Sequence, residues 1–299
     1  MSFKRHLEPL FIAALSKLYD DRNSWWHALV RDEDVFIAIR SNSINAYAGG
    51  ASIARIAWNN GLQLRVHRKF LVVPKPRSGD DAYADLLRRD GPPVEAVTVN
   101  TEVDYVQHLL AIKAAARRLT GHERSGEIEI ATSCPCVLDV EAAFDSTAPP
   151  DSSDDDIGSV GRVDIVAIND GGHVTLTETK LYSNSEIRSK IAPTVCTQLV
   201  EYYNWARDHA SDIIGAYTDV QDYRRKLHLR LAFESIPTVV DLDVIPRLII
   251  FGFDSTQKSQ IPGIKNKIVE GLRGRIPEFQ ETHIRAVGNP SNIGAHHLQ

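Results

Sequence analysis

The sequence has little cysteine. Its three cysteines, Cys134, Cys136 and Cys196, are too few among 299 residues for a disulfide framework and lack the paired CxxC spacing of a zinc site. We therefore expect thiols and a reducing compartment, by default the cytoplasm. The stretch "SCPC" (133–136) is interpreted as two buried thiols in a strand rather than as a metal or redox pair.

Long apolar runs and nucleotide-binding loops are also missing. No apolar run reaches the roughly 18 to 20 residues of a membrane span, so no membrane partner is expected. The opening "MSFKRHLEPLFIAALSKLYDD" is interrupted by charged residues and is followed by no small-residue cleavage site, which favours an amphipathic helix over a signal peptide. Without a GxxxxGK[ST] phosphate loop, no nucleotide cofactor is expected.

The formal net charge of -5 is unevenly distributed along the chain. Residues 91–180 carry 6 Lys and Arg against 16 Asp and Glu, whereas residues 1–90 carry 14 against 10 and residues 181–299 carry 14 against 13. The acidic middle is either a solvated surface or a cation site whose charge a metal compensates. Composition is otherwise that of a globular protein, with 43% hydrophobic and 24% charged residues.

Turn signals divide the chain near residue 95. Residues 34–73 are rich in β-branched and aromatic residues and are punctuated by Ser-Asn-Ser, Gly-Gly and Asn-Asn-Gly, which predicts an antiparallel meander of three or four strands. Breaks at 74–81 and 90–93 indicate a domain boundary. We therefore expect a smaller β-rich domain over 1–95 that recognises a substrate or a partner.

Helical and strand patterns alternate after this boundary. Apolar spacing predicts helices over 101–119, about 184–208 and 264–276, with Pro193 delaying or kinking the second. Strands are expected over about 127–140, in both halves of 161–180, and over 244–254. This order predicts an α/β (α+β) domain over 96–285, with a mixed sheet flanked by helices, and a flexible tail over 286–299.

The segment "GRVDIVAINDGGHVTLTETK" (161–180) places charged residues inside two runs that otherwise predict buried strands. If "DGG" (170–172) forms a three-residue hairpin loop, the register sets Asp164 opposite Glu178 and Arg162 opposite Lys180. The same register matches the apolar residues of one face, Ile168 with Val174 and Val166 with Leu176. Two carboxylates this close repel, and a hard divalent cation such as Mg²⁺ relieves the repulsion. The alternative is a strand pair with exposed charged ends and a cross-strand salt bridge.

A third group of residues favours a divalent cation site over the structural alternative. In "TVCTQLVEYYNWA" (194–206), Gln198 and Tyr202 are four apart and share one face of the expected helix. Together, "GRVD" (161–164), "ETK" (178–180) and "QLVEY" (198–202) resemble the G-x-x-D, (D/E)-x-K and Q-x-x-x-Y motifs of the PD-(D/E)XK nuclease superfamily, RecB-like branch. The motifs cover about 45 residues, and Val163 stands where the family name has proline.

The resemblance implies a restriction-endonuclease-like fold and a metal-dependent nuclease that hydrolyses phosphodiester bonds. Asp164 and Glu178 would hold Mg²⁺ or Mn²⁺, with Glu102 as a loosely matched third carboxylate. Lys180 would act on the attacking water, with Gln198 and Tyr202 positioning the substrate or the motif around it. No cysteine follows Cys196, so the iron-sulfur cluster of some RecB-like members is not expected.

The expected partner is nucleic acid, preferably DNA, with a homodimer or a partner protein as further options. Arg162 and the basic stretch 65–77, which contains Arg68 and Lys69, are candidates for phosphate contacts, although alternating basic residues also keep an edge strand soluble. Genome defence against phage and repair both fit such an enzyme. Two alternatives stay open: a catalytically idle binding module on the same fold, and an unrelated α+β protein whose charges are structural.

Overall fold

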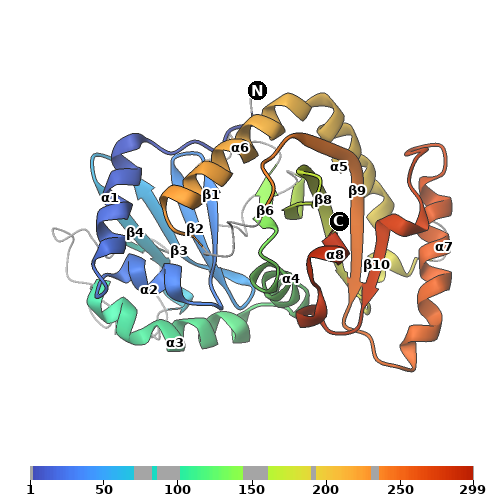
Figure 1. Cartoon of the computed structure of the whole chain (residues 1–299). Helices are drawn as coiled ribbons and strands as arrows, with labels where there is room; N and C mark the ends of the chain where they lie inside the picture. The colour runs from blue at the N-terminus through green and yellow to red at the C-terminus, as the bar shows by residue number, and fades with distance from the viewer. Residues whose placement is uncertain are drawn as a thin grey trace. The chain divides into compact units, whose positions relative to one another are not determined.

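Two sheets flanked by helices make up this mixed α and β protein, seen here in a computed structural model (Figure 1). The structure describes residues 3–70, 83–85, 102–143, 161–189, 193–229 and 236–298. The acidic loop expected near residues 146–159 and the breaks predicted at 74–81 and 90–93 lie outside these ranges. The chain forms two compact units, and each contains one sheet.

The N-terminal unit comprises residues 5–132 and 222–231. Its sheet is the predicted antiparallel meander, with a fifth strand added and with the strands in sequence order. The expected amphipathic helix is also present, with Phe11 and Leu15 buried on its inner face. The strands are β1 (Phe36–Arg40), β2 (Ser43–Ala48), β3 (Ala51–Trp58), β4 (Leu62–His67) and β5 (Tyr83–Asp85), and the first helices are α1 (Pro9–Asp20) and α2 (Trp25–Arg31).

Two further helices, α3 (Glu102–Leu119) and α4 (His122–Ser133), group with this sheet up to Thr132, so the unit extends past the boundary predicted at residue 95. The helix predicted over 101–119 is confirmed. The strand predicted from residue 127 is wrong over 127–133, which is helical. The alternation Glu-Ile-Glu-Ile resembles a strand, yet the buried positions 127, 128, 130 and 131 follow the helical period.

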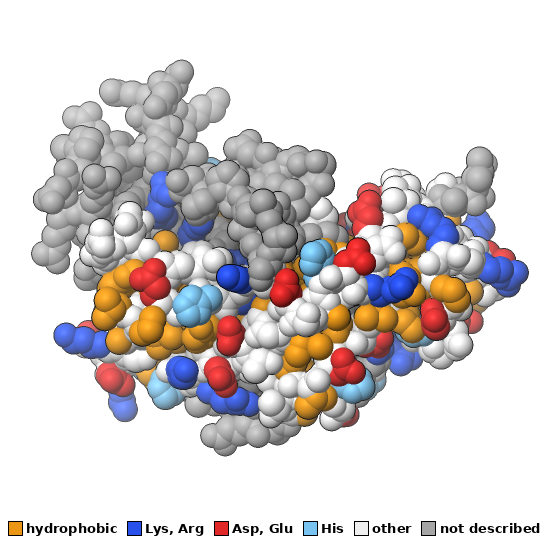
Figure 2. Space-filling view, turned by 90° about the horizontal axis from the view of Figure 1, so that it is seen from above, with side chains coloured by type: hydrophobic (Ala, Val, Ile, Leu, Met, Phe, Trp, Pro, Cys, Tyr) orange, Lys and Arg blue, Asp and Glu red, His pale blue; other side chains and the backbone are white. Residues whose placement is uncertain are grey.

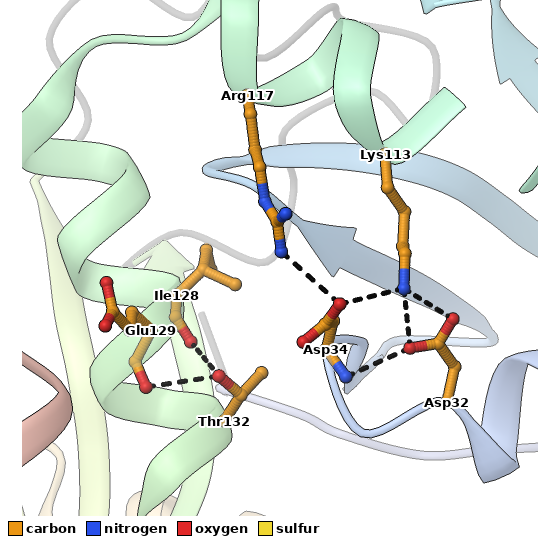
Figure 3. A network of polar contacts seen from close by, with 7 residues as sticks. All are labelled: Asp32, Asp34, Lys113, Arg117, Ile128, Glu129 and Thr132. Carbon is orange, nitrogen blue, oxygen red and sulfur yellow. Dashed lines mark hydrogen bonds and ion pairs between the residues drawn. The ribbon is translucent and has the colours of Figure 1, made fainter. Parts of the chain in front are cut away.

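A polar network fixes α3 to the loop before β1 (Figure 3). The Lys113 ammonium lies 2.8 Å from both carboxylate oxygens of Asp32 and 3.0 Å from Asp34 Oδ2. Arg117 donates a further hydrogen bond of 3.3 Å to the same Asp34 oxygen. Hydrogen bonding to Lys113 lowers the pKa of Asp34 below its usual value. Lys113 is buried, so removal of its carboxylate partners would leave an uncompensated charge in the protein interior.

The C-terminal unit holds the second sheet, in the order β10-β9-β8-β7-β6. Strands β6, β7 and β8 are antiparallel to one another, and β9 and β10 continue parallel to β8. The mixed sheet predicted for this region is therefore confirmed. The strands are β6 (Val137–Ala143), β7 (Arg162–Ile168), β8 (His173–Leu181), β9 (Asp241–Phe251) and β10 (Ile284–Val287).

Helices α5 (Val195–Asp208) and α7 (Ile261–Leu272) cover one face of this sheet. Their apolar side chains, among them Leu199 and Ile268, pack on Leu248 and Ile250 of β9. Helix α5 begins two residues after Pro193, as expected from a proline that delays the helix, and the short 3₁₀ helix η2 (Ser185–Ile187) precedes it. Helix α6 (Ala210–Lys226) was not predicted, because its sequence is mostly polar.

The tail predicted to be flexible is ordered instead through residue 298. Residues 284–287 form β10, and the short helix α8 (Ala295–Leu298) follows. The Leu298 side chain is fully buried, and its carbonyl accepts a 3.2 Å hydrogen bond from the Thr175 hydroxyl. Polar composition concealed this packing because only a few apolar residues, among them Ile293 and Leu298, are buried in the segment.

Cys134 and Cys136 form a disulfide, so the prediction of two thiols in a strand is wrong. The turn between α4 and β6 brings their Cα atoms to 5.4 Å, within the range that a disulfide spans. Cys196 remains a buried thiol. The disulfide removes the argument from cysteine content for a reducing compartment.

No helix in the described ranges is long and apolar enough to cross a membrane. On the face drawn in Figure 2, acidic and basic side chains of the described residues are interspersed. That pattern differs from the continuous basic surface typical of proteins that track a phosphate backbone.

Candidate functional site

The hairpin between β7 and β8 sets the geometry of the candidate site. Gly172 takes the left-handed conformation with φ +79°, and Asn169 Oδ1 accepts hydrogen bonds from the N–H groups of Gly171 (3.0 Å) and His173 (2.9 Å). The three-residue loop therefore has the predicted register: Ile168 pairs with Val174 and Val166 with Leu176. One step beyond the last ladder pair, Ile165 with Thr177, the same register brings Asp164 level with Glu178.

A third carboxylate continues this row on β6. The register of β6 pairs Val140 with Ile165 and Ala142 with Val163, which leaves Glu141 level with Asp164. Glu141 has φ +50°, an uncommon conformation for a residue other than glycine. Three acidic residues on three adjacent strands thus stand side by side at one end of the sheet.

Asp164 is held by its neighbour strand. Its Oδ2 accepts a 2.7 Å hydrogen bond from the Thr179 N–H and a 3.1 Å hydrogen bond from the Thr179 hydroxyl. Burial raises the pKa of Asp164 well above its usual value, and the nearby charges of Glu178 and Glu141 raise it further. The protein therefore holds a carboxylate that gains stability from a proton or from a cation.

Glu178 is the most deeply buried of these carboxylates, with a relative exposure of 1%. Its Oε2 contacts the Tyr202 hydroxyl, and its Oε1 lies 2.7 Å from the Lys180 ammonium. Burial raises the pKa of Glu178, although Lys180 and Tyr202 oppose that effect. Both carboxylate oxygens are thus engaged by groups that carry or donate a proton.

Lys180 lies between two carboxylates. Besides Glu178, its ammonium lies 2.8 Å from Oε2 of Glu186 in η2. Burial alone would lower the pKa of Lys180, but the charges of Glu178 and Asp164 outweigh it, so the pKa is raised. Lys180 is therefore an ammonium ion at neutral pH.

Helix α5 supplies two of the predicted residues. Tyr202 is buried, and its hydroxyl contacts the Arg162 carbonyl as well as Glu178, which fixes the helix against both strands. Gln198, one turn earlier, has a buried Oε1 without a hydrogen-bond partner among the described residues. An unsatisfied buried acceptor is uncommon and calls for a donor or a cation.

The other predicted residues lie elsewhere. Arg162 is at the start of β7, where its guanidinium lies 3.5 Å from Glu141 Oε2, so it faces a carboxylate. Glu102 is the first residue of α3, in the other unit, and its side chain lies outside the described part. Arg68 and Lys69 form part of a 3₁₀ turn after β4, also in the other unit, with the Lys69 ammonium 5.2 Å from the centre of the Phe70 ring.

Two further glutamates of the site, Glu141 and Glu186, are not predicted from the sequence. The strand predicted there ends at residue 140, one residue before Glu141, and no motif includes Glu141. Glu186 follows Lys180 by six residues in a segment expected to be helical. Its position depends on a turn at 182–184 that brings η2 back toward β8, and apolar periodicity carries no signal for such a turn.

The donor set suits a hard divalent cation. Asp164 and Glu178 offer carboxylate oxygens on adjacent strands, and one or two carboxylates completed by water suffice for Mg²⁺. Within the described ranges no cluster of three or more His, Cys, Asp or Glu side chains has the arrangement of a metal site.

Comparisons with models of known protein families, with curated proteins and with solved structures gave no match to this chain. The site is therefore interpreted from its own chemistry: a buried and a partly buried carboxylate on neighbouring strands, the Lys180 ammonium, and a tyrosine hydroxyl from α5.

Proposed function

We propose that the protein is a metal-dependent nuclease of the PD-(D/E)XK superfamily, with DNA as substrate and with the C-terminal unit as its restriction-endonuclease-like core. The observation that carries the proposal is the convergence of three separate motifs. Asp164, Glu178 and Tyr202 come from β7, β8 and α5, yet Glu178 contacts both Tyr202 and Lys180, and the charges of Glu178 and Lys180 act on Asp164. Residues with purely structural roles would have no reason to place crowded charges on an apolar face.

In this proposal a bound Mg²⁺ or Mn²⁺ supplies Lewis acidity toward a phosphate oxygen and water. Asp164 and Glu178 would hold the ion through their carboxylate oxygens. Thr179 fixes Asp164 and Tyr202 fixes Glu178, so both carboxylates are oriented before the ion arrives.

Lys180 carries a positive charge beside the same carboxylates. Because its ammonium pairs with two carboxylates, we assign it electrostatic stabilisation of the negative charge that develops on the phosphate, and orientation of the attacking water. This assignment differs from a role as proton acceptor, which would require the neutral amine.

The test is cleavage of supercoiled plasmid, linear duplex, single-stranded DNA and RNA by purified protein with Mg²⁺, with Mn²⁺ or with EDTA. Lys180→Ala is the test variant. Lys267→Ala, which removes the same charge from an exposed position on α7, is the matched control. We expect metal-dependent cleavage by the wild type and the control and at least about a hundredfold loss in Lys180→Ala. Equal activity in the two variants would contradict the proposed site.

The four substrates also distinguish between the two biological roles, genome defence and repair. Nicking or linearisation of the plasmid indicates an endonuclease, which suits defence against invading DNA. Degradation restricted to linear DNA indicates an end-dependent enzyme, which suits repair. If the wild type neither cleaves nor binds a divalent ion, the alternative of a catalytically idle binding module gains support.

A further inference from the structure

Glu186 has no counterpart in the three motifs, yet it is the second partner of the central lysine. The Lys180 side chain is 7% exposed, and its ammonium lies 2.7 Å from Glu178 Oε1 and 2.8 Å from Glu186 Oε2. The Glu186 side chain is 36% exposed, so it reaches the lysine from the solvent side of the site. Lys180 is therefore shared between an inner carboxylate, Glu178, and an outer one, Glu186.

A divalent ion on Glu178 would compete with this lysine. Glu178 Oε2 contacts Tyr202, so Oε1, the oxygen beside Lys180, is the one that must open toward an incoming cation. An ammonium ion and a divalent cation repel when both approach one oxygen. Lys180 must therefore move away from Glu178 when the ion binds, and a buried ammonium that loses one carboxylate partner is strongly destabilised unless another carboxylate pairs with it.

The local structure around Glu186 holds its carboxylate in position as an alternative partner for Lys180. Asn184 caps η2 by accepting a 2.9 Å hydrogen bond from the Glu186 N–H. The next residue, Ile187, is fully buried in the core formed with α5 and α7. The backbone of Glu186 is thus fixed on both sides, which holds its carboxylate beside Lys180.

We propose that Glu186 is a positioning residue that accepts the Lys180 ammonium when a divalent ion takes over Glu178 Oε1. The inference rests on the proposed function, because it requires that Glu178 bind a metal ion. Glu186 itself stays outside the metal shell and acts only through the lysine.

A double-mutant cycle on Mn²⁺ affinity tests this role without relying on cleavage. Mn²⁺ binding is measured by calorimetry for wild type, Glu186→Gln, Lys180→Met and the double variant. Glu186→Gln should weaken Mn²⁺ binding by about tenfold, because the ammonium then loses its outer carboxylate partner and competes more strongly for Glu178 Oε1. Lys180→Met should bind Mn²⁺ more tightly than wild type. In the Lys180→Met background, Glu186→Gln should change the affinity by less than about twofold.

Glu201→Gln, on the exposed side of α5, is the charge-matched control and should leave the affinity unchanged. Circular dichroism melts establish that each variant is folded. A loss in Glu186→Gln that persists in the Lys180→Met background would overturn the proposal, since Glu186 would then act on the ion directly or through its charge alone. Unchanged affinity in Glu186→Gln would overturn it too, while leaving the metal site standing. Absence of Mn²⁺ binding to the wild type would instead reject the proposed function together with this inference.

Discussion

Replacement of Asp164 by asparagine separates a structural role of this carboxylate from a role in holding a cation. Asparagine keeps an oxygen that can accept the hydrogen bonds donated by Thr179, and it removes the negative charge beside Glu178 and Glu141. We expect Asp164→Asn to be more stable than wild type without metal, and to gain nothing when metal is added.

The size of the effect follows from the register. Two unit charges about 5 Å apart, the spacing of directly opposed strand residues, repel by about 3 kcal/mol at an effective dielectric constant of about 20. Lys180, which lies 2.7 Å from Glu178 Oε1, offsets part of this repulsion. We therefore expect a net gain of about 1 to 2 kcal/mol in the free energy of unfolding at neutral pH.

The pH dependence has a defined sign. Burial and the neighbouring carboxylates raise the pKa of Asp164 above the ordinary value of 3.8. The folded protein therefore binds a proton that the unfolded chain has already released, and wild-type stability falls as pH rises from 3.8 through the raised pKa. The advantage of Asp164→Asn should accordingly be largest at neutral pH and should disappear in acid.

Urea unfolding at neutral pH, with EDTA and then with Mn²⁺ at about a hundred times its dissociation constant, measures both effects. Mn²⁺ should add about 2.7 kcal/mol to the wild type and nothing to Asp164→Asn. Asp170→Asn, at an exposed position of the hairpin loop, controls for the loss of one charge. If Asp164→Asn were less stable than wild type in EDTA by more than about 1 kcal/mol, the carboxylate would be structural and the reasoning refuted.

Three further predictions concern packing and charge away from the site. Lys113→Met should lower the free energy of unfolding by about 2 to 4 kcal/mol because Asp32 loses its buried partner, whereas Asp34→Asn, at a half-exposed carboxylate, should cost about 0.5 kcal/mol. The Asp34 contribution is present above pH 3.8 and is lost as pH falls through the lowered pKa, so urea midpoints of wild type and Asp34→Asn should converge in acid. Leu298→Ala should cost about 2 kcal/mol in the same assay if the C-terminal helix is packed, and no change would indicate a loose tail.

The sequence predicted those parts of the fold that local patterns specify. The turn at Gly172 and the apolar alternation beside it determine the register of β7 and β8, so the meeting of Asp164 with Glu178 followed from residue order alone. The helical spacing of Gln198 and Tyr202 likewise predicted that they share a face of α5. Periodicity gave the wrong element where the pattern was ambiguous. From Glu127 to Ile130 polar and apolar residues alternate as in a strand, yet the segment is helical and Glu127 is buried.

The remaining site residues could not be predicted, because tertiary contacts place them. Glu186 reaches Lys180 only because η2 turns back after β8, and Glu141 stands beside Asp164 only because β6 pairs with β7 across a segment of more than fifteen residues. Neither contact has a short sequence signature. Carboxylates in loops and on outer strands are common, so only the fold distinguishes these two from others in the acidic middle of the chain.

The position of Glu178 in the sheet explains why its charge is not relieved by movement. Strand β8 lies third of five, with partners on both sides, and its residues from Val174 to Lys180 are buried. A carboxylate on an edge strand or a loop could turn toward water, but Glu178 is fixed by Tyr202 and by two neighbouring strands. The repulsion with Asp164 is therefore retained in the folded protein, and a proton on Asp164, the Lys180 ammonium or a divalent ion can offset it. A structural salt bridge would need only one of these carboxylates, so the presence of the second favours an exchangeable cation.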